Sequence, residues 1–343
     1  MSFTKFPSIE QFRHVIANVK RHATYRGNDE HGNPIHVDED EAVLPTLHFR
    51  GTVKLHGTNA GVGYNKRHGI WAQSRNRVLT AEADNQGFFQ FVQQNRAAFE
   101  TLMAQVDHGE HETVCIFGEW CGQGIQKGVA IATLPKLFVI FAVKIVNNSD
   151  GERWLNESAL KRLKAADNMI FNVYDYETFD VTVDFNEPDS AVPTLDSITE
   201  KVEQRCPVAA VHGAIGIGEG VVWLAHHDTL GPVRFKVKGD QHRVVESKRK
   251  STATNAEHVE SLQKFVQYAV TENRLAQGIA VLFTSQNAEP SVQKIGEFLR
   301  WVQEDVLKEE ADVISKNNLE KKLVLKAIGT AACQWFLQKL NKQ

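Results

Sequence analysis

The feature that most constrains the fold is an almost unbroken apolar run at residues 137–146. Such a run is typical of a strand buried on both faces, because a strand with one solvated face alternates apolar and polar residues. Shorter apolar or alternating segments predict further strands at residues 47–53, 60–64, 70–74, 114–118, 221–224 and 233–238. The chain is therefore expected to contain a β-sheet that other elements cover on both sides.

Helices are expected between these strands. Apolar residues at helical spacing predict one helix at residues 8–20 and a longer one that runs from about Phe88 to Val106. A third helical pattern covers residues 156–166, where Asn156 is suited to be the N-cap.

Two polar segments are interpreted as loops. Residues 184–194 contain two prolines among polar side chains. Residues 21–41 contain three histidines and an acidic run. A metal site is conceivable there, but nothing in the spacing enforces a ligand geometry, so a solvated loop is the favoured interpretation.

The pattern changes after residue 239. Residues 239–255 are polar and typical of a linker. Beyond them, apolar residues recur at helical spacing in three groups: Val259, Leu262, Val266 and Ala269; Val292, Ile295, Leu299, Val302 and Val306; and Leu319, Leu323 and Ala327. We therefore predict a first domain at 1–240, a linker at 241–254 and an all-helical domain at 255–343.

Composition narrows the class of protein. The chain has 343 residues, of which 42% are hydrophobic and 24% charged, so a sizeable core is available. The net charge of -3 argues against a uniformly basic nucleic-acid coat but leaves room for a local basic groove. The four cysteines lack CxxC spacing, which argues against a zinc site or a disulfide framework. With no apolar leader or membrane-length run, we expect a soluble cytoplasmic protein.

Residues 54–59 read Lys-Leu-His-Gly-Thr-Asn and directly follow the predicted strand at 47–53. A lysine at a strand end is either a nucleophile or one surface lysine among many. The nucleophile needs a deprotonated amine, whereas the reference pKa of lysine is about 10.4. Burial or neighbouring cations lower that pKa, and Lys236 or Lys238 could provide the charge. A solvated edge strand is the alternative interpretation of the alternation at 233–238.

Two glutamates stand at strand ends. Glu119 follows the strand at 114–118, and Glu219 ends a glycine-rich stretch at 213–220 that leads into another strand. Their carboxylates suit Mg²⁺ or a ribose hydroxyl. A dinucleotide-binding loop at 213–220 is disfavoured, because a strand and not a helix follows the glycines.

In this order, the segments resemble the motifs of the covalent nucleotidyltransferases, which include ATP-dependent RNA ligases, DNA ligases and mRNA capping enzymes. Residues 54–59 match the KxHGTN nucleophile motif of the RNA ligase 2-type family. Further matches are Ser74-Arg75, Phe117-Gly118-Glu119, residues 122–127 with G-x-G-I-Q-K, the apolar segment 138–145, Glu219-Gly220-Val221-Val222 and Lys236-Val237-Lys238. The resemblance covers nearly the whole chain. It implies an α+β fold, with a nucleotidyltransferase domain of antiparallel β-sheets flanked by helices and a small all-α C-terminal domain.

The resemblance also implies a mechanism. Lys54 attacks the α-phosphorus of ATP and holds AMP, which then passes to the 5′-phosphate of an RNA end before a 3′-hydroxyl seals the strand. Mg²⁺ or Mn²⁺ assists. The implied roles are ribose binding by Glu119, adenine stacking by Phe141, phosphate binding by Arg75, Lys236 and Lys238, metal binding by Glu219, phosphate transfer by His56 and Asn59, and a cofactor contact by Leu55. The expected partner is RNA with a nicked duplex or paired ends, and the expected state is a monomer.

Three positions depart from the family pattern. Val53 replaces a carboxylate before the nucleophile, Ala142 replaces an aspartate, and Leu224 replaces a lysine. The missing phosphate contact is expected from Lys127 or Arg234. The alternatives are a DNA ligase or capping-type enzyme, or a catalytically inactive module that binds RNA ends.

Overall fold

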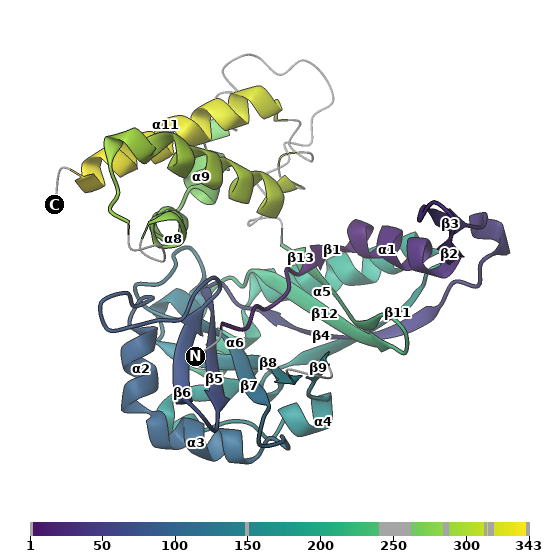
Figure 1. Ribbon diagram of the computed structural model, residues 1–343, viewed down its shortest axis with the longest axis horizontal. Helices are drawn as coiled ribbons and strands as arrows, with labels where there is room; N and C mark the ends of the chain where they lie inside the picture. Colours follow the sequence, from purple (N-terminus) through teal and green to yellow (C-terminus); the bar gives the residue numbers. More distant parts are fainter. Residues whose placement is uncertain are drawn as a thin grey trace. The chain divides into compact units, whose positions relative to one another are not determined.

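The protein is described by a computed structural model that covers residues 3–147, 151–239, 262–263, 265–283, 288–311, 314 and 319–340. It has a mixed α+β architecture (Figure 1). Contacts within the chain define two compact units. The first consists of residues 1–75 and 86–239, and the second of residues 76–85 and 240–343.

A five-stranded sheet in the first unit has the strand order β1-β13-β12-β4-β11. Its strands are β1 (Glu10–Gln11), β4 (Thr46–Lys54), β11 (Thr178–Asp184), β12 (Gly220–His227) and β13 (Gly231–Lys238). The β1–β13 pair is parallel and the other pairs are antiparallel. Phe49, Trp223 and Phe235 lie on one buried face of this sheet. The alternate residues of β4, β12 and β13, including Lys54 and Lys238, lie on the other face.

A six-stranded sheet has the order β10-β8-β7-β5-β6, with β9 paired to β8. Its strands are β5 (Thr58–Asn65), β6 (Gly69–Ser74), β7 (Thr113–Cys121), β8 (Leu137–Asn147), β9 (Gly151–Trp154) and β10 (Ile170–Asn172). The β10–β8 pair is parallel, so both sheets are mixed where wholly antiparallel sheets were expected. The prediction of a strand at 137–146 is confirmed, and nearly all its side chains are buried.

Helices cover one face of each sheet (Figure 1). On the first sheet lie α1 (Phe12–Thr24) and α5 (Val192–Gln204), and the ring of Phe12 is 4.8 Å from that of Phe235. On the second lie α2 (Phe88–Gln94) and α3 (Arg96–Ala104), whose phenylalanines contact Phe138. The short elements are α4 (Glu157–Leu160), α6 (Pro207–Val211) and the 3₁₀ turns η1 (Glu39–Glu41), η2 (Ala130–Thr133), η3 (Ala166–Asn168), η4 (Val173–Asp175) and η5 (Pro188–Ala191).

Two helix predictions need correction. The first helix begins at Phe12 and not at residue 8, because Glu10–Gln11 pairs with β13 as a strand. The helix predicted from Phe88 to Val106 is two helices that meet at Asn95. The Asn95 side chain donates a hydrogen bond to the Phe91 carbonyl, which competes with regular helix geometry.

The loop prediction for residues 184–194 is wrong. A 3₁₀ turn there leads directly into α5. Pro193 stands in the first turn of α5, where its missing N–H has no helical partner to lose. Proline was therefore a helix-start signal at this position.

The loop predicted at 21–41 is also more structured than expected. It holds the end of α1, a hairpin of β2 (Tyr25–Asn28) and β3 (Pro34–His36), and η1. Farther along the chain, the Asn156 N-cap is confirmed, since its side chain accepts from the Ala159 N–H. However, α4 ends at Leu160, well before residue 166.

The described part of the second unit contains α8 (Glu272–Leu282), η7 (Val292–Lys294), α9 (Ile295–Glu309) and α11 (Lys321–Leu340). Its core includes Phe283, Phe298 and Phe336. The apolar stripe predicted through Leu323 is wrong, because Leu323 is 48% exposed and α11 buries Val324 instead.

The predicted domain boundaries remain a prediction, and the linker at 241–254 lies outside the described residues. The sequence did not indicate that residues 76–85 belong with the second unit. Across the described ranges, no helix combines the length and apolar character needed to span a membrane.

Candidate active site

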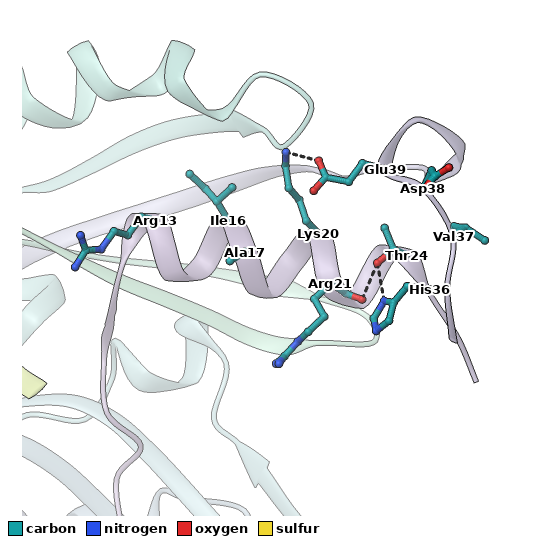
Figure 2. A pocket seen from close by; sticks show the side chains of 10 residues that line it. All are labelled: Arg13, Ile16, Ala17, Lys20, Arg21, Thr24, His36, Val37, Asp38 and Glu39. Carbon is teal, nitrogen blue, oxygen red and sulfur yellow. Dashed lines mark hydrogen bonds and ion pairs between the residues drawn. The ribbon is translucent and has the colours of Figure 1, made fainter. Parts of the chain in front are cut away.

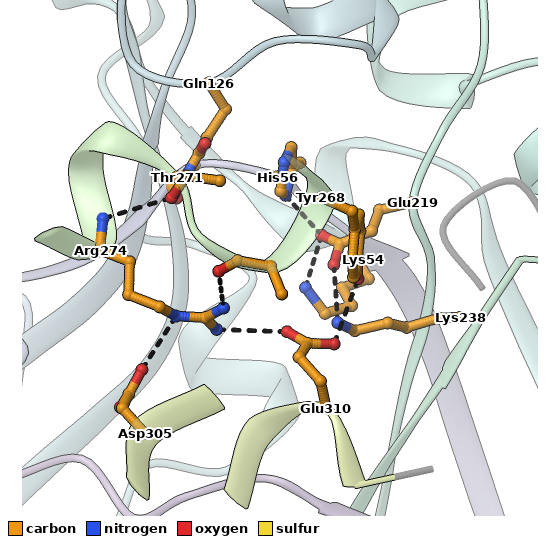
Figure 3. Close-up of polar contacts among 12 residues, drawn as sticks. Lys54, His56, Gln126, Glu219, Lys238, Tyr268, Thr271, Arg274, Asp305 and Glu310 are labelled. Carbon is orange, nitrogen blue, oxygen red and sulfur yellow. Dashed lines mark hydrogen bonds and ion pairs between the residues drawn. The ribbon is translucent and has the colours of Figure 1, made fainter. Parts of the chain in front are cut away.

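Three basic side chains converge on the buried carboxylate of Glu219, as Figure 3 shows. The Nζ atom of Lys54 lies 2.5 Å from Glu219 Oε2, and Nδ1 of His56 lies 3.4 Å from the same oxygen. The Nζ atom of Lys238 lies 3.7 Å from Oε1. Residues from three distant parts of the chain therefore meet at one carboxylate.

The strand register explains why they meet. Gly220, the first residue of β12, is paired with Lys54 at the end of β4 and with Lys238 at the end of β13. The backbone of Gly220 has φ +150°, and a Cβ there would lie 2.8 Å from the Lys238 Cα. Only glycine fits this close approach, which brings the preceding Glu219 between the two lysines.

The charge balance of this cluster is unequal. Burial alone would raise the pKa of Glu219, but Lys54, His56 and Lys238 outweigh it and hold that pKa well below its usual range. Glu219 is therefore ionised, and in this cluster one carboxylate lies among three basic side chains. A site with more basic than acidic side chains favours an additional anion.

A second carboxylate, Glu119, lies near the same lysine. Its Oε1 accepts a hydrogen bond of 3.0 Å from the Gly57 N–H. Burial raises the pKa of Glu119 to about 7; Lys54 opposes this shift and Glu219 adds to it. A proton on Glu119 is therefore in equilibrium near neutral pH, which is typical of functional sites.

The turn after Lys54 is tightly packed. A Cβ on Gly57 would lie 2.8 Å from the Cys121 Cβ and 3.0 Å from the Glu119 Cγ. The side chain of Gln126 donates to the Gly57 carbonyl over 3.2 Å. This packing fixes the position of His56 relative to β7.

Three of the remaining predicted residues lie near this cluster. Asn59 is paired with Glu119 across β5 and β7, Arg75 lowers the Glu119 pKa, and Lys236 lies two residues before Lys238 on the same face of β13. Leu55 is buried in the core.

The ring of Phe141 lies 5.0 Å from that of Phe6, in edge-on contact, and Phe141 is only half-buried.

Sequence reasoning missed Phe6 and the role of Gln126 in the turn. Phe6 is buried and also contacts Phe117 and Trp154. Nothing in its local sequence predicted this, since the contacts join parts of the chain far apart. Gln126 belongs to the segment 122–127 that matches G-x-G-I-Q-K, but the sequence did not predict its hydrogen bond to Gly57.

One other place could have been a site. A cavity of about 600 Å³ lies beside α1 and includes Arg13, Lys20 and His36 (Figure 2). None of the predicted site residues lines it. In the part of the chain that the structure describes, no group of three or more histidine, cysteine or acidic side chains could hold a metal ion.

Comparison with solved structures finds similarity to Naegleria gruberi RNA ligase. A mutant of that protein with ATP and Mn is 16% identical, with a TM-score of 0.44, over 71% of this chain and 58% of that one. The same ligase with PPi is 15% identical, with a TM-score of 0.43, over 70% and 57%. The chain thus spans less than two thirds of the length of these proteins.

No curated protein matches the chain. A sequence model of the family described as RNA ligase matches residues 47–238, which is more than half of the chain. The matched segment contains Lys54, Glu119, Glu219 and Lys238. The chain belongs to the RNA ligase family.

Proposed function

We propose that this protein is an ATP-dependent RNA ligase that works through a covalent lysyl-AMP intermediate. The observation that supports it is the contact of 2.5 Å between Lys54 and Glu219 inside a cluster with an excess of basic groups. A lysine there is partly withdrawn from water, since its side chain is 20% exposed. It is also next to a carboxylate able to receive its proton.

The first step transfers AMP to the lysine. One proton leaves the Lys54 ammonium, and the amine nitrogen forms a bond to the α-phosphorus of ATP. The bond from that phosphorus to the bridging oxygen breaks, and pyrophosphate leaves with the electron pair. A second proton leaves the nitrogen to give the phosphoramidate. Because Lys54 helps to hold the Glu219 pKa low, loss of its charge makes Glu219 a better proton acceptor.

The other residues bind and orient the nucleotide. Arg75, Lys236 and Lys238 are proposed to bind phosphate oxygens, Glu119 the ribose and Phe141 the base. Leu55 is proposed as a further cofactor contact, and His56 and Asn59 serve the transfer steps. A divalent metal, Mg²⁺ or Mn²⁺, neutralises phosphate charge when bound, and Glu219 is the carboxylate proposed to act with it. One or two carboxylates plus substrate phosphates are the usual ligands of Mg²⁺, so this donor set fits.

Two transfers complete the proposed reaction. An oxygen of an RNA 5′-phosphate attacks the phosphorus of lysyl-AMP, and Lys54 leaves and regains a proton. A 3′-hydroxyl then attacks the activated 5′-phosphate, loses its proton and expels AMP as the phosphodiester forms. We propose nicked duplex RNA or paired RNA ends as substrate, with the protein acting as a cytoplasmic monomer.

Mass spectrometry after incubation with ATP and Mg²⁺ tests the first step. We expect one AMP increment that maps to Lys54. Aliquots then receive a nicked RNA duplex, a nicked DNA duplex or single strands, and sealing of the RNA nick is expected. An unmodified protein would overturn the lysyl-AMP proposal, and sealing of DNA alone would overturn the RNA assignment.

A further inference from the structure

The face of the first sheet that carries Lys54 continues as rows of side chains. The strand register places Lys54, Gly220 and Lys238 in one row. Two residues farther along each strand, the next row is Thr52, Val222 and Lys236; the third row is Arg50, Leu224 and Arg234. All three rows are on one face, because side chains alternate along a strand.

The third row is within reach of a nucleotide attached to Lys54. Four residues along a strand span about 13 Å, which separates Lys238 from Arg234. This span is comparable with the length of a nucleoside monophosphate. If the phosphate lies at the first row, the base therefore lies over the second and directs its far edge toward the third.

Arg234 is half-buried, and aromatic rings lie against its guanidinium. Its guanidinium carbon lies 4.4 Å from the centre of the Trp154 ring and 5.6 Å from that of Phe6. Burial lowers its pKa to about 10, opposed only in part by Tyr174. Within the described residues, no hydrogen bond or ion pair joins this guanidinium to another side chain.

The arginine in the same row makes a useful contrast. Arg50 lies 2.6 Å from Asp180 and 3.7 Å from Glu157, so its charge is compensated. Burial of part of the Arg234 guanidinium without an acceptor is unfavourable, because its donors lose hydrogen bonds to water. The cost is recovered if a ligand brings the acceptor.

The surroundings indicate the chemistry of that ligand. Aromatic rings pack against the guanidinium, so its N–H groups are left to donate in its own plane. One of these in-plane donors matches a ring nitrogen on the edge of a purine, since such a nitrogen is a hydrogen-bond acceptor. Phe6, which also contacts Phe141, is held in place because the Thr4 N–H donates to Gln73 over 3.2 Å and the Gln73 side chain donates back to the Thr4 carbonyl.

We propose that Arg234 binds the edge of the transferred nucleobase by donating a hydrogen bond to a purine ring nitrogen, N1 or N7. This inference rests on the proposed function and gives Arg234 a role other than the phosphate contact, which the sequence analysis expected from Lys127 or Arg234. Its register partner on β12 is the apolar Leu224, so at this pair β13 supplies a polar group that β12 lacks.

The test combines Arg234→Met with base analogues. Binding of ATP, 1-deaza-ATP and 7-deaza-ATP is measured at equilibrium, and adduct formation at Lys54 is measured in parallel. The wild-type protein is expected to lose roughly 10- to 100-fold in affinity for one of the two analogues. Arg234→Met should lose a similar factor for ATP and no longer distinguish ATP from that analogue. Methionine keeps an apolar stem against the rings, and the melting temperature verifies folding.

Arg50→Met is the matched control in the same row, and it should change binding of ATP and both analogues by one common factor. If Arg234→Met still discriminates as the wild type does, or the wild type binds all three equally, the inference is overturned. If discrimination depends on Arg234 but no AMP attaches to Lys54, the base site stands and the ligase proposal falls.

Discussion

Two buried ionic clusters, one in each unit, differ in how their charges balance. Around Glu219, one carboxylate faces Lys54, Lys238 and His56. In the second unit, one guanidinium faces two carboxylates: Arg274 lies 2.9 Å from Asp305 and 3.2 Å from Glu310 (Figure 3). The first cluster has an excess of basic groups and the second an excess of acidic ones.

In the second cluster, further hydrogen bonds surround Arg274 and Glu310. Burial would lower the pKa of Arg274, but Glu310 and Asp305 outweigh burial and raise it, so the guanidinium stays charged. Tyr268 donates to Glu310 over 3.3 Å, and Arg274 also donates to the Ala269 carbonyl. Through Arg274, the ion pairs join α8 to Asp305 of α9 and to Glu310, the residue that follows α9. Such a network orients helices, whereas the basic side chains around Glu219 favour binding of an anion.

Lys54→Arg is expected to have the largest effect on activity. The guanidinium keeps a cation beside Glu219, but it stays protonated and cannot act as a nucleophile. AMP attachment should therefore disappear while the melting temperature changes little. Lys66→Arg is the control, because Lys66 is exposed and pairs with Glu110 at 2.5 Å. An AMP adduct that persists in Lys54→Arg would show that Lys54 is not the nucleophile.

Glu219→Gln tests how much the carboxylate at the centre of the first cluster contributes to stability. Without the carboxylate, buried basic groups lose their counter-charge, and we expect a loss of about 3–5 kcal/mol in the free energy of unfolding. Pyrophosphate should restore part of this loss, since the site then binds anions more strongly. Denaturant unfolding with and without pyrophosphate measures both effects.

Glu310→Gln is the counterpart in the second unit. Arg274 keeps Asp305, so the expected loss is smaller, about 1–2 kcal/mol, and pyrophosphate should not reverse it. Equal rescue of both variants by pyrophosphate would contradict the difference between the clusters.

The strands that carry the site could be predicted from the sequence, because apolar runs and alternating apolar and polar residues are typical of strands. The strand at 137–146 and the alternation that places Lys236 and Lys238 together are confirmed. The RNA ligase family match covers residues 54–59 and the later motifs up to Lys238. The roles of the individual side chains remain proposals.

The other half depends on contacts between distant segments. Phe6 reaches Phe141 because Thr4 pairs with Gln73, and no periodicity in residues 3–9 encodes that pairing. Likewise, alternation placed Arg234 on a face but could not show that Trp154 stacks on it. Proline misled the prediction at α5, since it is compatible with both a loop and a helix start.

Glu119→Gln tests the pH dependence of the first unit. The folded pKa of Glu119, about 7, is above its usual value of 4.5, so between these values the folded protein holds a proton that the unfolded chain lacks. Stability should therefore fall as pH rises from about 4.5 to 7 and level off above. The variant has no such proton, so its melting temperature should rise relative to that of the wild type as the pH increases from 5 to 7. Parallel plots of melting temperature against pH for the two proteins would contradict the raised pKa.

Arg274→Lys should have an effect as small as that of Glu310→Gln, and it should be confined to the second unit. Lysine keeps the charge but not the planar fork, so it cannot reach Asp305, Glu310 and the Ala269 carbonyl with the same geometry. We expect the helical unit to lose about 1–2 kcal/mol, measured by hydrogen exchange in α8 and α9. AMP attachment at Lys54 should keep the wild-type rate, because the excess of basic groups around Glu219 lies wholly in the first unit. A slower attachment would mean that the second cluster takes part in nucleotide chemistry and is more than a brace between helices.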